Sequence, residues 1–228
     1  MLDLDDPGLL PNFLEIEDQP SAQDIKAMID DWVPWNLMYA TLHEPQYENS
    51  LYGPWNTLLS AIFPHRRQFV IKPQALLRRV VEEDLSDQDI SIGSYEGRHE
   101  SRTLPGHEDE RLLPDFAPCK FQQVWADEDR SLIAERTYKL LCILELKRNA
   151  AFAGHARSQI ITYVRRSQYH PNRQEPIFGY LVLGKTIQKF GMLGPLVAGP
   201  MGDAVDLNSR EGRVYIDELC QLSADNWN

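Results

Sequence analysis

One apolar stretch constrains the fold most strongly. Residues 139–147, read as KLLCILELK, predict a buried strand that ends in two charges. A continuous apolar run of this length is typical of a central strand that is covered on both faces. Because side chains alternate along a strand, Glu145 and Lys147 share one face of it. Burying a charge is costly, so these two must pair with each other, reach solvent or bind a metal. We therefore expect the strand to end in a functional site.

The segments around this strand predict a mixed α/β order. Helical spacing and capping signals indicate helices, and β-branched or aromatic runs between turn residues indicate strands. Residues 86–111 are rich in Gly, Ser, Asp, Glu and Arg and predict a long loop, and 194–206 predict another. The final segment, 209–222, fits a strand or a helix. The first expected helix is 22–33, which ends before Pro34. Further helices are expected at 48–63, 75–85 and 149–168, and further strands at 68–75, 114–125 and 177–187.

The net charge of −11 is distributed unevenly. Residues 1–50 hold eleven of the 34 acids and only one of the 23 Lys and Arg residues, so the remainder is nearly neutral. Small basic clusters at 65–67, 78–79 and 165–166 in this remainder are suited to contacts with phosphates. We therefore divide the chain into an acidic N-terminal extension, 1–47, that contains a short helix, and a second domain, 48–228.

Several classes of protein lack support in the sequence. No apolar run is long enough for a membrane helix, and the acidic start, MLDLDDPG, is unlike a signal peptide, so we expect an intracellular protein, nuclear or cytoplasmic, with no membrane partner. The three cysteines have no CxxC spacing and predict buried free thiols. The sequence has no HExxH, GxSxG or GxGxxG motif.

Three short motifs occur in a suggestive order. Pro114-Asp115 begins a predicted strand, Glu145-Leu146-Lys147 ends the next one, and Gln159 and Tyr163 follow on the next predicted helix, where a spacing of four puts them on one side. This arrangement resembles the PD-(D/E)XK nuclease superfamily, in its RecB-like branch with a QxxxY element. The stretch YGPWNTLL, followed by FP and KPQ, also resembles fungal members associated with mobile elements. The resemblance covers about residues 48–190.

The resemblance implies a restriction-endonuclease-like fold. Its αβββαβ core would have a small mixed sheet flanked by helices, and here a helical N-terminal extension would be added. It also implies catalytic roles for Asp115, Glu145 and Lys147, with Mg²⁺ or Mn²⁺ bound by Asp115, Glu145 and the backbone carbonyl of Leu146. Lys147 would assist the attacking water, and Gln159 and Tyr163 would position the substrate.

Two assignments stay open in the sequence. The family usually adds an acid from the first core helix, and Glu48 is our choice for it, with Glu82 and Glu83 as alternatives. The 30 residues between Asp115 and Glu145 are long for a simple hairpin, so we expect 126–137 to bulge out between the strands. If the register of the strand before Glu145 differed, Asp127 or Asp129 would be the metal ligand in place of Asp115.

The leading functional hypothesis is a metal-dependent nuclease that hydrolyses phosphodiester bonds, with DNA favoured over RNA as substrate. The alternative is a catalytically inactive nuclease-like domain that binds nucleic acid or protein. A third reading is a structural domain in which Lys147 forms a surface salt bridge. The acidic extension is a candidate for docking a protein partner or for an autoinhibitory contact over the cleft, and a homodimer is also compatible with the sequence.

Overall fold

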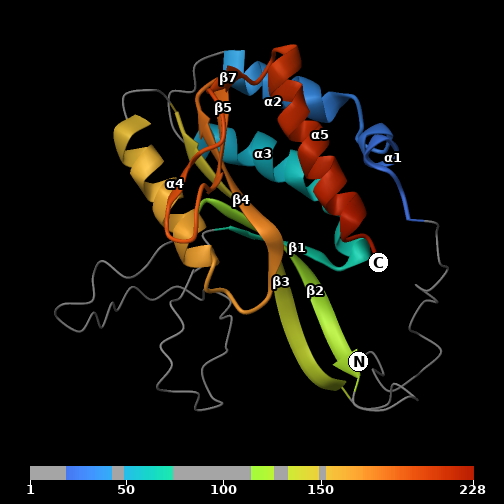
Figure 1. Cartoon of the computed structure of the whole chain (residues 1–228). Helices are drawn as coiled ribbons and strands as arrows, with labels where there is room; N and C mark the ends of the chain where they lie inside the picture. The colour runs from blue at the N-terminus through green and yellow to red at the C-terminus, as the bar shows by residue number, and fades with distance from the viewer. Residues whose placement is uncertain (1–18, 43–48, 74–113, 126–132, 149–152) are drawn as a thin grey trace, which may run out of the picture.

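The computed structural model describes residues 19–42, 49–73, 114–125, 133–148 and 153–228. Within them, a seven-stranded sheet has helices packed on both faces (Figure 1). This confirms the expected mixed α/β class with a central sheet flanked by helices. The elements are α1 (Ala22–Ala27), α2 (Trp32–Leu42), α3 (Asn49–Ile62), the 3-10 turn η1 (His65–Arg67), β1 (Phe69–Pro73), β2 (Phe116–Trp125), β3 (Ile133–Lys147), α4 (Ala153–Ser167), β4 (Arg173–Leu183), β5 (Thr186–Met192), β6 (Ala198–Pro200), β7 (Val205–Asp206) and α5 (Arg210–Asp225).

The strands follow the order β1-β2-β3-β4-β5-β6, and β7 also pairs with β5. Among the described strands only β3 and β4 pair in parallel, and α4 lies in the crossover that a parallel pair requires. The described α-helices and strands from α3 to β4 follow the order helix, strand, strand, strand, helix, strand. The sheet is larger than the small one expected, because β5, β6 and β7 add antiparallel pairs to its far side.

A long β2–β3 hairpin replaces the bulge that was expected between the two strands. Residues 133–137 continue β3 and pair with the end of β2, for example Thr137 with Gln122, so the prediction is wrong for this segment. Pairing supplies the backbone N–H and C=O groups of both strands with partners, which a bulge would not. The hairpin extends well away from the rest of the sheet (Figure 1).

The first helix is shorter than predicted. Its start is confirmed, because Ser21 and Asp24 form a reciprocal capping box. Its expected end at Pro34 is wrong, because α1 ends at Ala27 and a second helix starts at Trp32. Pro34 thus lies in the first turn of α2, where its missing N–H costs no intrahelical hydrogen bond.

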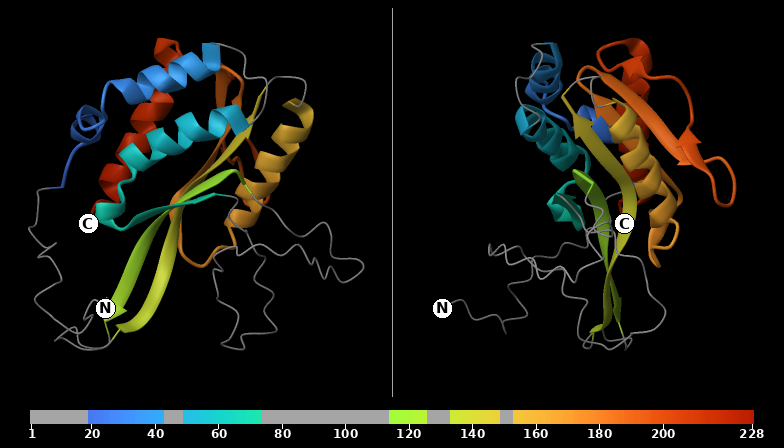
Figure 2. Two further views of the ribbon diagram at one scale, coloured as in Figure 1. Left: turned by 180° about the vertical axis from the view of Figure 1, so that it is seen from behind. Right: turned by 90° about the vertical axis from the view of Figure 1, so that its left-hand side faces the viewer.

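The sheet separates two hydrophobic clusters. The larger one packs α1, α2, α3 and α5 against one face, and includes Ile25 and Leu37 from the N-terminal helices. The smaller one packs α4 against the other face, through Ala156, Ile160 and Val164. Figure 2 shows α4 set apart from α1, α2 and α3. Glu145, which follows Ile143 by two residues in β3, faces the α4 side of the sheet.

The C-terminal part differs from the expectation in three places. The predicted strand 177–187 is split at Gly184, whose φ of 57° allows the tight turn between β4 and β5. The predicted loop 194–206 contains β6 and β7. The ambiguous segment 209–222 is helical, and Ser209 caps α5 by accepting a 3.0 Å hydrogen bond from the backbone N–H of Gly212.

Within the described part of the chain, no helix is both long enough and apolar enough to cross a bilayer.

Candidate active site

The end of β3 carries a buried ion pair. Glu145 Oε1 lies 2.8 Å from Lys147 Nζ, and the side chains are 3% and 14% exposed, respectively. Glu145 follows Ile143 on the face covered by α4, while Leu144 and Leu146 belong to the core on the other face. The strand therefore places both charges on one face, as its alternation predicts.

Asp115 lies directly beside this pair. It precedes β2, whose first residue, Phe116, is opposite Leu144 of β3. Oδ2 of Asp115 accepts a 2.6 Å hydrogen bond from the backbone N–H of Leu146, and the side chain is buried. The structure thus brings Asp115 and the Glu145-Leu146-Lys147 triplet together across two neighbouring strands.

The two carboxyl groups are electrostatically coupled. Burial, together with the negative charge of Asp115, raises the pKa of Glu145 to about 7, although Lys147 acts in the opposite direction. Oε2 of Glu145 is buried and has no hydrogen-bond partner within the described ranges. A buried carboxylate beside a second acid is stabilised by a cation, and Lys147 contacts only one of its two oxygens.

Tyr163 of α4 lies near this site, and Gln159 stands one turn earlier on the same helix. Tyr163 is buried, and the charges of Glu145 and Asp115 contribute, after burial itself, to a raised pKa of its hydroxyl. Gln159 is partly buried, and its Oε1 has no hydrogen-bond partner among the described residues. The structure therefore places Tyr163 close to the acidic pair, and it places Gln159 one turn earlier on the same helix.

The sequence analysis missed one residue of the site, Tyr52. Its hydroxyl donates a hydrogen bond to Oδ1 of Asp115, which ties the first turns of α3 to the start of β2. Tyr52 also packs against Phe116, with ring centroids 5.5 Å apart. The sequence did contain a signal for Tyr52. It lies four residues after Glu48, the acid chosen for this helix, and residues at that spacing share one side of a helix.

Five candidate acids cannot be placed. Glu48 lies outside the described residues, as do the alternatives Glu82, Glu83, Asp127 and Asp129. The expected helix 75–85 also lies there. The described part of the site therefore consists of Asp115, Glu145, Lys147, Tyr163 and Tyr52.

Asp115 and Glu145 are the side chains that could hold a divalent cation. Their carboxylate oxygens are the hard ligands that Mg²⁺ prefers, and Mg²⁺ usually takes only one or two protein carboxylates and keeps several waters. The unpartnered Oε2 of Glu145 fits this role. Among the residues described, no group of three or more His, Cys, Asp or Glu side chains gathers as a metal site, so two carboxylates are the described set.

The chain was compared with protein family models, with curated proteins and with solved structures. None of the three comparisons gives a match. The function must therefore be argued from the site itself.

Proposed function

We propose that this chain is a metal-dependent nuclease that hydrolyses phosphodiester bonds in nucleic acid, with DNA favoured over RNA. The observation that carries the proposal is the convergence of Asp115, Glu145 and Lys147 at one point of the sheet. Two further features support it: Tyr163 lies near both acids, and the helix-strand order from α3 to β4 fits the αβββαβ core of the PD-(D/E)XK superfamily.

The proposed metal ligands are Asp115, Glu145 and the backbone carbonyl of Leu146. A bound Mg²⁺ or Mn²⁺ would lower the pKa of a coordinated water and neutralise charge on the phosphate. The N–H of Leu146 donates to one oxygen of the Asp115 carboxylate and the hydroxyl of Tyr52 donates to the other, and together they fix its orientation. Glu48 remains the proposed third acid of this site.

Lys147 is proposed to act on the attacking water or on the phosphate. Its ammonium now contacts Oε1 of Glu145, and its side chain is the more exposed member of the pair. A cation between the carboxylates would weaken the attraction between Glu145 and Lys147 and leave the ammonium available to a phosphate oxygen. Gln159 and Tyr163 are proposed to position the substrate backbone or the lysine.

A nuclease assay with matched variants tests this proposal. Plasmid and single-stranded DNA and RNA are incubated with the protein in Mg²⁺, in Mn²⁺ and in chelator. We expect metal-dependent cleavage that Asp115→Asn and Glu145→Gln each reduce by at least about 100-fold, as loss of a group acting on the transition state does. Asp225→Asn, which removes a carboxylate at the end of α5, is the control and should cleave normally. Cleavage that persists in both site variants rejects the site.

One observation favours the second candidate, a catalytically inactive nuclease-like domain that binds nucleic acid or protein. Asp115 and Glu145 are only 5% and 2% exposed, and Lys147 already neutralises one oxygen of Glu145. Direct titration with Mg²⁺ or Mn²⁺ separates the two candidates. Metal binding that Glu145→Gln abolishes supports the nuclease, while nucleic-acid binding without metal binding or cleavage supports the inactive domain.

A further inference from the structure

The segment that includes α4 has an unusual charge composition. From Lys147 through Gln174, both included, there are six Lys and Arg residues and no Asp or Glu. At the average frequency of 34 acids in 228 residues, a segment of this length would contain about four acids. The segment is therefore strongly basic within a chain of net charge −11.

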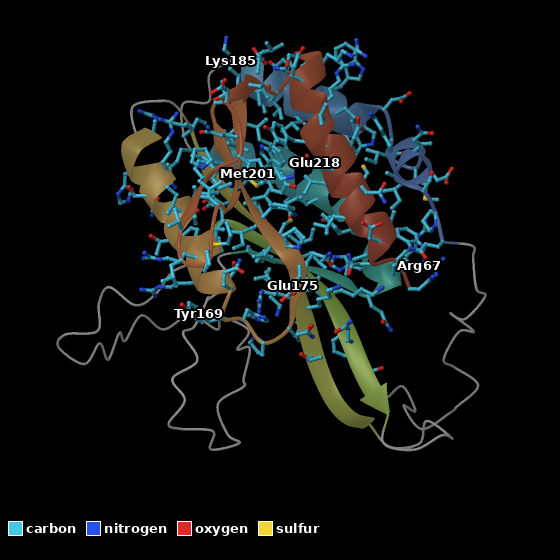
Figure 3. All side chains as sticks on the ribbon, in the orientation of Figure 1. Arg67, Tyr169, Glu175, Lys185, Met201 and Glu218 are labelled. Carbon is cyan, nitrogen blue, oxygen red and sulfur yellow. The ribbon has the colours of Figure 1, made fainter. Side chains whose placement is uncertain are left out.

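The outer side of α4 presents part of this charge to solvent. Arg157 and Arg165 are exposed, and no described carboxylate forms an ion pair with either of them. Tyr169, just beyond the helix and four residues after Arg165, is 59% exposed (Figure 3). Exposed arginines are suited to contacts with phosphates, and an exposed aromatic ring is suited to stacking on a base.

The helix on the opposite side of the sheet, α5, has no such excess of positive charge. The helix α5 carries four acids, Glu211, Asp217, Glu218 and Asp225, against two arginines, Arg210 and Arg213. Figure 3 shows Glu218 on α5 and Tyr169 at the end of α4, well apart from each other. Two of the four acids, Asp217 and Glu218, are also paired with Lys26 and Lys189. A polyanion would therefore be attracted to α4 more strongly than to α5.

The basic side also adjoins the candidate active site. The inner side of α4 carries Tyr163, which lies near Glu145 and Asp115. Lys72 of β1 lies 3.6 Å from the ring centroid of Tyr138 and close enough to His170, beside Tyr169, to influence its charge. The positive charge thus continues from the outer side of α4 onto the edge strand.

We propose that Arg157, Arg165 and Tyr169, named here the basic α4 surface, bind the backbone of the nucleic acid and guide it toward Asp115 and Glu145. The choice of nucleic acid as the polyanion rests on the proposed function. Arg157 and Arg165 contact phosphates, and Tyr169 stacks on a base at an end or in a single-stranded stretch. Positive charge on this side also explains how an acidic chain can approach a polyanion.

A binding assay in chelator isolates this surface from cleavage. The probe is a fluorescein-labelled DNA duplex of about 20 base pairs, and its anisotropy is measured at several salt concentrations. The test variant is Arg157→Gln with Arg165→Gln. The control is Arg210→Gln with Arg213→Gln, which makes the same charge change at exposed positions of α5. Both variants should fold normally, because exposed substitutions of this kind change stability by only about ±0.5 kcal/mol; thermal melts check this.

The test variant should raise Kd at least about tenfold near 0.1 M salt, and should reduce the slope of log K against log salt by about 1.8, the value for two lost phosphate contacts. The control should bind like the unchanged protein. Equal effects of the two variants, an unchanged slope, or no binding by the unchanged protein would overturn the inference. Loss of binding in the test variant, with no cleavage by the unchanged protein in Mg²⁺, would support the surface and reject the nuclease. Normal cleavage by the unchanged protein, with DNA binding unaltered in the test variant, would reject the surface and support the nuclease.

Discussion

The backbone N–H of Leu146 donates a hydrogen bond to Oδ2 of Asp115, with 2.6 Å between the two atoms. This bond joins the end of β3 to the start of β2 and places the carboxylate next to Glu145. Hydrogen bonds to a charged acceptor are stronger than those between neutral groups. The bond therefore helps to hold the two acids next to each other.

Tyr52→Phe should weaken the site. It removes the hydroxyl that donates to Oδ1 of Asp115 and leaves a buried carboxylate oxygen with one donor fewer. We expect a loss of about 1–3 kcal/mol in the free energy of unfolding, measured with denaturant, and a lower affinity for Mn²⁺. Tyr169→Phe is the control, because Tyr169 is exposed, and it should change stability by no more than about 0.5 kcal/mol. Equal stability of the two variants would exclude a structural role for the Tyr52 hydroxyl.

Stability without metal should decrease as the pH rises from about 4.5 to about 7. In this range the folded state keeps a proton on Glu145, whose pKa is raised to about 7, while the unfolded state releases it near the ordinary value of 4.5. Folding stability is therefore lost as the pH rises through this window, by an amount on the order of 3 kcal/mol. His170, whose pKa is lowered by burial, contributes in the opposite direction below its ordinary value of 6.5.

Comparing variants separates these contributions. Glu145→Gln should remove the decrease in stability between pH 4.5 and 7. Between pH 5 and pH 8 the variant should therefore lose less free energy of unfolding than the unchanged protein does. Asp225→Asn, which lies outside the site, should show the same decrease in stability as the unchanged protein. Denaturant unfolding at four or five pH values provides the measurement. A decrease of the same size in Glu145→Gln would show that another group is responsible.

Two glycines, one packed against α4 and one within it, should respond to substitution in opposite directions. A Cβ at Gly179 of β4 would lie 2.7 Å from Cγ2 of Val164, so Gly179→Val should push α4 away from the sheet and cost about 1–3 kcal/mol. It should also reduce cleavage, because α4 carries Tyr163. Gly154, in the first turn of α4, has open space, and Gly154→Ala should stabilise by about 0.5–1 kcal/mol. Thermal unfolding of both proteins checks the contrast, and a stable Gly179→Val would contradict it.

The C-terminus should depend on a buried lysine. Lys120 is 6% exposed, and its Nζ donates to the carbonyls of Arg67 and Trp227 at 2.8 and 2.9 Å. Lys120→Met removes both donors, so we expect a loss of about 2–4 kcal/mol and faster hydrogen exchange in residues 222–228. Lys185→Met is the exposed control and should exchange normally. Unchanged exchange in Lys120→Met would show that packing alone holds the C-terminal residues.

Local patterns in the sequence determined much of the fold and part of the site. The apolar run ending at Lys147 predicted the central strand, and its alternation placed Glu145 and Lys147 on one face. The capping signal at Ser21 and the helical spacing of 149–168 predicted the start of α1 and the existence of α4. These patterns succeed because they depend on neighbours within a few residues along the chain.

Tertiary structure decided the features that depend on distant segments. Pro34 lies in the first turn of a helix instead of ending one, which depends on where that helix packs. Residues 133–137 extend a strand because they pair with β2, a partner that is not visible locally. The contact of Tyr52 with Asp115 joins residues 63 apart in sequence. The sequence alone therefore determined which side chains share a face of one element. Only packing between elements decided which faces meet, since that choice depends on burying apolar surface from the whole chain at once.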